Sequence, residues 1–123
     1  MIPSQMLKGI LQGSILAIIS QKETYGYEIS QALARYGFGT ISEGTIYPLL
    51  LRLEKGGLIV ARFLDTGSGP KRKYYTLTPA GQEELTQFQM SYREMTAAVD
   101  SLPGFGKEES HEERDQTAPE GEQ

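Results

Sequence analysis

Three adjacent cations, Lys71, Arg72 and Lys73, follow a glycine-rich stretch at 65–70 that should form a flexible turn. Ammonium and guanidinium groups bind phosphate oxygens, lysine as a point charge and arginine through a planar fork. A basic run on a mobile turn therefore suits a grip on the sugar-phosphate backbone of a nucleic acid. By itself such a run is usually a solvated turn, so its meaning depends on the elements around it.

A second polar group lies on the segment 43–59, EGTIYPLLLRLEKGGLI. At helical spacing one side of this segment is apolar, with Ile46, Leu49, Leu50 and Leu53. The other side is small or polar, and Ser42 is placed to cap the helix, where backbone N–H groups can bind a phosphate. We expect this face to meet DNA through Ser42, Thr45, Tyr47 and Arg52.

Catalytic and metal chemistry find little support in the sequence. The chain has no cysteine and a single histidine, His111, which disfavours a transition-metal site. No nucleophile–base pairing is apparent, and GSGPKR at 67–72 lacks the strand–loop–helix setting of a phosphate-binding loop. We expect neither an enzyme nor a cofactor.

The order of the predicted elements favours a mainly α fold with a small β-hairpin, a winged helix-turn-helix. Helices are expected at 4–20, at 25–36 after a Thr24 cap, and at 42–55 before Gly56 and Gly57. Strands are expected at 58–64 and 73–77, and Thr78-Pro79 should begin a long helix to about 103. Gly9 and Gly13 share one face of the first helix and leave room for a close crossing.

The last helix carries the clearest periodicity in the chain. Its apolar residues are spaced alternately three and four apart, at Leu85, Phe88, Tyr92, Met95, Val99 and Leu102. Such a narrow stripe suits packing against another helix, and a second copy of the chain is a natural source. The alternative is packing against the helix at 4–20 of the same chain.

Charged residues are distributed unevenly along the chain. Residues 1–100 hold ten basic and nine acidic residues, whereas 101–123 hold two and seven. We expect a DNA-binding domain at 1–78, a dimerisation helix at 79–103 and a disordered acidic tail at 104–123. The apolar run at 10–19 is short and interrupted by Gln12, Gly13 and Ser14, so a core helix is favoured over a signal or membrane segment. A cytoplasmic location follows.

Three motifs in this order resemble the PadR family of bacterial transcriptional regulators. They are YGYEI at 25–29, EGTIYPLLLRLEKGGLI at 43–59 and GPKRKYYTLTPAG at 69–81. The resemblance implies a homodimeric winged-helix repressor that binds pseudo-palindromic double-stranded DNA, with its DNA helix at 42–55 and its wing at 59–77. The short chain is similar to the smaller subfamily, in which the C-terminal helix pairs across the dimer with the first helix.

The resemblance also implies a small-molecule effector. Some members of that subfamily bind flat aromatic compounds in a central pore between subunits, using a tryptophan on the C-terminal helix. This chain has no tryptophan, and Tyr92 stands at the corresponding position. Tyrosine stacks with less area and a polar tip, so Tyr92 is either the effector residue or a residue that only packs.

A different class of function stays open beside DNA binding. A winged helix that has lost DNA binding would serve as a dimeric protein-interaction adaptor. The cations at 71–73 and the polar edge formed by Ser42 and Thr45 favour DNA.

Overall fold

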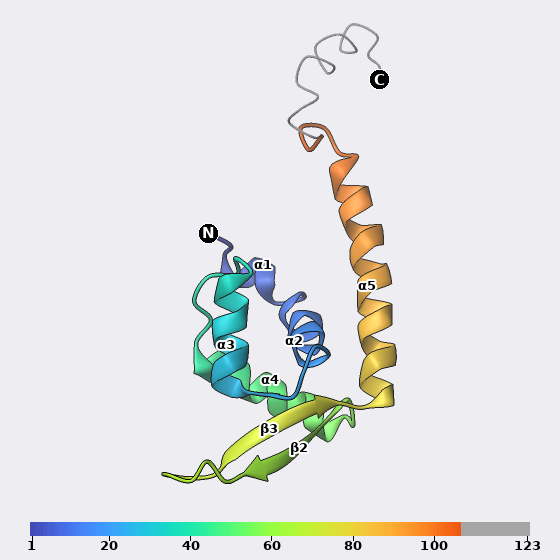
Figure 1. Ribbon diagram of the computed structural model, residues 1–123. Helices are drawn as coiled ribbons and strands as arrows, with labels where there is room; N and C mark the ends of the chain where they lie inside the picture. Colours follow the sequence, from blue (N-terminus) through green and yellow to red (C-terminus); the bar gives the residue numbers. More distant parts are fainter. Residues whose placement is uncertain (107–123) are drawn as a thin grey trace, which may run out of the picture. The chain divides into compact units, whose positions relative to one another are not determined.

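The structure is a computed structural model that describes residues 1–106. It contains two compact units, one from Met1 to Phe88 and a second that begins at Gln89. The described residues are mostly helical with a small antiparallel sheet, as predicted (Figure 1). In chain order the elements are α1 Ser4–Leu7, α2 Leu11–Ile19, β1 Thr24–Tyr25, α3 Gly26–Arg35, α4 Glu43–Lys55, β2 Ile59–Leu64, β3 Arg72–Leu77 and α5 Pro79–Asp100.

The single helix predicted over 4–20 is wrong, because the chain breaks between α1 and α2. Gly9 lies in the break, where its low helix propensity favours interruption. The Ile10 N–H donates to the Leu7 carbonyl at 2.9 Å, which makes a tight turn. Leu7 and Leu11 are both buried on either side of this turn.

The predicted cap at Thr24 is also wrong. Thr24 belongs to β1, where it pairs with Tyr75 of β3, and its buried hydroxyl donates to Glu28 Oε1 at 2.8 Å. Tyr25 occupies the N-cap position of α3 and makes no side-chain cap. The sheet of the described residues therefore has the order β1-β3-β2, one strand more than the predicted hairpin.

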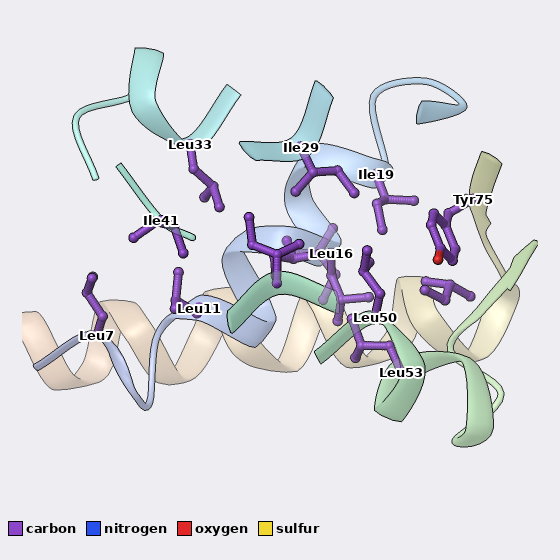
Figure 2. Close-up of a cluster of buried hydrophobic side chains, with 14 residues drawn as sticks. Leu7, Leu11, Leu16, Ile19, Ile29, Leu33, Ile41, Leu50, Leu53 and Tyr75 are labelled. Atoms are coloured by element: carbon purple, nitrogen blue, oxygen red, sulfur yellow. The ribbon is translucent and has the colours of Figure 1, made fainter. Parts of the chain in front are cut away.

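The core lies where α2, α3 and α4 meet the sheet. Figure 2 shows the buried side chains of these helices turned toward one another, with Tyr75 entering from β3. Within α4, Ile46, Leu50 and Leu53 are buried, as the predicted apolar side requires. This packing fixes α4 about its own axis and so fixes which residues it presents outward.

The start of α5 is anchored to the link between α4 and β2. The Thr78 hydroxyl accepts a hydrogen bond from the Gly81 N–H at 3.0 Å, which confirms the predicted cap, and donates to the Gly57 carbonyl at 2.7 Å. The Thr78 N–H donates to the Leu58 carbonyl at 3.1 Å. Gly81 lies so close to that carbonyl that a side chain there would overlap it.

The apolar stripe of α5 changes character along its length. Leu85 is buried, and the ring of Phe88 lies against Gly13 of α2, so these two pack within the protomer. The remaining four are exposed: Tyr92 46%, Met95 45%, Val99 37% and Leu102 51%. No helix in residues 1–106 is long and apolar enough to span a bilayer. The predicted acidic tail falls, from residue 107 on, outside the described residues.

Candidate nucleic-acid interface

Helix α4 presents a polar surface opposite its buried leucines. Gly44, Thr45, Pro48 and Arg52 are exposed along this side. Ser42 occupies the N-cap position as predicted, although its hydroxyl makes no bond to the helix backbone. It lies instead 3.2 Å from the Thr45 hydroxyl. The first turn therefore offers paired hydroxyls at the end where a helix favours anions.

A hollow of about 700 Å³ runs beside this polar surface, between α1 and α4. Ser42, Thr45 and Arg52 line its α4 side. Its other side includes Lys8, just beyond the end of α1. Lys8 was not among the predicted DNA-binding residues. Only the folded chain brings this cation to the same hollow as Arg52, because the two are far apart in sequence.

A second groove, of about 520 Å³, lies between α4, the start of α3 and the β2–β3 wing. Tyr47 and Leu51 line it from α4, and the three predicted wing cations line it from the other side. Leu51 is exposed and forms part of this wall. None of the residues that line the groove is acidic; they are Tyr25, Gly26, Tyr27, Tyr47, Leu51, Lys71, Arg72, Lys73 and Tyr75.

Tyr47 has a second role besides its place on the outer border of α4. Its ring lies against Gly26 at the start of α3, and a Cβ at Gly26 would come within 2.6 Å of the Tyr47 hydroxyl oxygen. Glycine at position 26 therefore allows the ring of Tyr47 to approach the backbone of α3. This contact ties α4 to α3 beside the groove.

The three wing cations have unlike surroundings. Lys71 is exposed and precedes β3, whereas the guanidinium of Arg72 lies 4.6 Å from the ring centre of Tyr25. Tyr25 in turn packs against Tyr74, with ring centres 5.1 Å apart. Because successive side chains of a strand point to opposite faces, Lys73 turns away from Arg72.

Lys73 forms an ion pair with α4. Its Nζ lies 3.0 Å from Glu54 Oε1, and both side chains are about two-thirds shielded from solvent. The Glu54 carboxylate raises the pKa of Lys73 above its ordinary value, so the lysine stays charged. Burial raises the pKa of the neighbouring Tyr75, which stays neutral. Lys73 therefore connects β3 to α4.

Tyr25 and Tyr27 were not among the predicted DNA-binding residues. The structure brings both to the groove, and Tyr27 is 51% exposed. No local sequence signal marks them, because the two-residue strand β1 brings the start of α3 alongside the wing strand β3 only through its pairing in the folded chain. In residues 1–106 no cluster of three or more His, Asp or Glu residues could hold a metal ion.

Comparison with known proteins places this geometry in a family. A family model described as the transcriptional regulator PadR-like family matches residues 15–87. A PadR-like transcriptional regulator from Bacillus cereus, known from its crystal structure, is 50% identical with a TM-score of 0.73, covering 84% of this chain and 99% of that one.

Two curated relatives are also similar. A transcriptional regulator of Mycobacterium tuberculosis is 38% identical over 87 residues, which cover 69% of this chain and 78% of that protein. The negative transcriptional regulator PadR of Bacillus subtilis is 28% identical over 92 residues, which are 73% of this chain and 50% of that protein. The family model, the crystal structure from Bacillus cereus and the relative from Mycobacterium tuberculosis agree. This chain therefore belongs to the PadR-like family of transcriptional regulators.

Proposed function

We propose that this chain is a homodimeric, sequence-specific repressor that binds double-stranded DNA. The observation that carries the proposal is that Tyr47 of α4 and the wing cations line one groove with no acidic lining, while the polar side of the same helix is exposed. The major groove of DNA admits an α-helix, and the first residues of such a helix reach the base edges. Thr45 and Tyr47 lie in the first half of α4, which supports their assignment to base edges. We assign the phosphate contacts to Ser42, Arg52 and Lys71.

The proposed dimer rests on the outer part of α5. Three of its apolar side chains are exposed at the spacing of a helix-packing stripe: Met95, Val99 and Leu102. Exposure of such a row of apolar side chains to water is unfavourable, so a protein surface is expected to cover it. A dimer would present two copies of α4 to a pseudo-palindrome, with half-sites about 10 bp apart. In this arrangement residues 1–78 bind DNA and residues 79–103 dimerise. Because a transcriptional regulator acts where the DNA is, the proposal implies a cytoplasmic location.

Repression and its relief by an effector form the finer part of the proposal. The relative from Bacillus subtilis is named a negative transcriptional regulator, which supports the same sign of control here. Tyr92, exposed on α5, is the residue proposed to stack on a small aromatic effector. A panel of planar aromatic compounds tested for quenching of tyrosine fluorescence, with Tyr92→Leu as control, would test this role. Equal quenching in both proteins would remove Tyr92 from any effector site.

Selection from a random pool of duplexes, followed by titration at fixed salt, tests DNA binding itself. We expect enrichment of a pseudo-palindrome and binding at least a thousandfold tighter than to random DNA, about 4 kcal/mol. If no sequence is enriched and random duplexes are not bound, the chain is instead an adaptor that binds protein. A reporter placed behind the selected site separates repression from activation.

A further inference from the structure

The β2–β3 wing is joined to the rest of its protomer by ion pairs on both faces of the sheet. On one face Lys73 bonds Glu54 of α4. On the other, Arg62 of β2 bonds Glu23, which comes directly before β1. Arg62 lies opposite Tyr74 in the strand register, so it shares the face of Tyr74 and not that of Lys73. The wing is therefore tied both to α4 and to the segment that leads into α3.

The pair of Arg62 and Glu23 has the geometry of a two-bond clamp. The Arg62 Nε donates to Glu23 Oε2 at 2.6 Å, and its Nη2 donates to Oε1 at 2.7 Å. Hydrogen bonding to Arg62 lowers the pKa of Glu23, so this carboxylate is ionised at neutral pH. An exposed ion pair contributes little to stability unless its geometry is bidentate, as here. Two parallel bonds also fix orientation, which a single contact does not.

The same face of the sheet connects this clamp to a cation of the wing. Tyr74 lies opposite Arg62, and its ring packs against Tyr25 with centres 5.1 Å apart. The guanidinium of Arg72 lies 4.6 Å from the ring centre of Tyr25. Arg72 and Tyr74 point to one face because alternate residues of a strand do so. A shift of β2 against Glu23 should therefore disturb the stack that restrains Arg72.

The charge of Glu23 makes a direct contact with DNA an unsuitable explanation. A carboxylate beside a DNA-binding wing repels phosphates, so its presence opposes binding unless it does something else. The neighbouring Arg62 keeps its fork on Glu23, which occupies two of the donors that a phosphate would need. Both residues are thus placed to hold the wing and not to contact the nucleic acid.

We propose that Glu23 and Arg62 are positioning residues for DNA binding, which clamp the wing against the segment before α3 and so hold Arg72 in place. The inference rests on the proposed DNA binding and adds two residues that act through others. A wing that is already fixed loses less conformational freedom when DNA binds, so the clamp should increase affinity.

The first test depends on the sign of an effect. In Glu23→Gln an acid is lost, so electrostatics alone predicts tighter binding to a duplex selected from a random pool. If Glu23 positions the wing, binding should instead weaken, by about threefold. Asp65→Asn is the matched control, because Asp65 is an acid at the end of the same wing and accepts only the Gly67 N–H. It should bind at least as tightly as the wild type. Tighter or unchanged binding by Glu23→Gln would overturn the inference.

A double-mutant cycle distinguishes positioning from a phosphate contact of Arg62. Glu23→Gln and Arg62→Gln break the same pair, so the double variant should bind about threefold more weakly, as each single variant does. If Arg62 itself held a phosphate, its loss would weaken binding further in the Glu23→Gln background. Multiplied losses, about ninefold in the double variant, would therefore overturn the positioning role.

Amide hydrogen exchange tests the clamp without DNA. Strands β2 and β3 should exchange faster in Glu23→Gln and in Arg62→Gln than in the wild type, whereas Asp65→Asn should match the wild type. Equal exchange in all four proteins would overturn the clamp while DNA binding stands. Failure of the wild type to select any duplex would instead overturn the proposed function, and with it the role of the clamp in DNA binding.

Discussion

The α4–wing surface and the outer part of α5 leave side chains of opposite character exposed. The first presents phenols and cations around a groove. The second presents Met95, Val99 and Leu102 along one helix stripe. Each region is exposed, but only the first has the polar donors that a phosphate backbone requires. The second has the apolar character that another protein surface requires.

If the proposed function holds, one short chain divides DNA binding and self-association between these two regions. Leu85 and Phe88 mark where the apolar stripe of α5 stops serving the fold of its own protomer. Before that point a substitution should damage the fold, and beyond it only association. On the α4–wing surface a substitution should change DNA binding and leave association intact.

The largest effect is expected at Gly81, where α5 is anchored. In Gly81→Ala the new Cβ would overlap the Leu58 carbonyl, and backbone cannot move as a flexible side chain does. We expect a loss of about 3 kcal/mol in the free energy of unfolding. The matched control is Gly44→Ala, where only Ser42 Oγ lies nearby, at 3.7 Å. There alanine should stabilise α4 by up to about 1 kcal/mol. Chemical denaturation of both variants measures these changes in the free energy of unfolding.

Val99→Asp should separate association from folding. A carboxylate without a partner at a buried helix contact should raise the dimer dissociation constant on the order of 100-fold, about 2.7 kcal/mol. Ala97→Asp adds the same charge on the opposite side of α5 and should leave the dimer unchanged. Sedimentation at several concentrations measures both. A wild-type monomer at micromolar concentration would contradict the assignment of this stripe.

The wing carries the next prediction. Replacing Lys71 and Arg72 with alanine should weaken binding to all duplexes by a similar factor, about 2 kcal/mol, and lower the salt slope by about two units. The double variant Lys22→Ala with Arg35→Ala removes the same charge outside the groove and serves as control. An effect restricted to the selected sequence, with the slope unchanged, would mean that the wing reads bases.

Sequence patterns predicted the features of this molecule that depend on residues close together in the chain. The apolar side of α4, the hairpin and the Thr78 cap each depend on neighbouring residues, and the structure has all three. The two-residue strand β1 is too short to have a period, so Thr24 was assigned to a helix cap. Its pairing depends on β3, which comes about fifty residues later in the chain.

The candidate site shows the same limit more sharply. Adjacent cations at 71–73 read as one basic patch, but strand alternation and Glu54 give Arg72 and Lys73 different partners. Tyr27 and Lys8 reach the surface around α4 through tertiary packing, which no local pattern encodes. Residues on α4 itself were predictable because one buried side determines the other.

Thr45→Val should give the smallest effect and the most specific one. Valine keeps the shape of threonine and removes its hydroxyl, so the selected duplex should lose about 1 kcal/mol if that hydroxyl bonds a base. The Thr45 hydroxyl also lies 3.2 Å from Ser42 Oγ, so part of any loss could come through Ser42. Ser42→Ala, alone and combined with Thr45→Val, separates the two, because additive losses mean independent contacts. Random DNA should bind Thr45→Val almost as well as wild type, and the dimer should be unchanged. Equal losses on selected and random duplexes would assign Thr45 to the phosphate backbone and place base recognition elsewhere on α4.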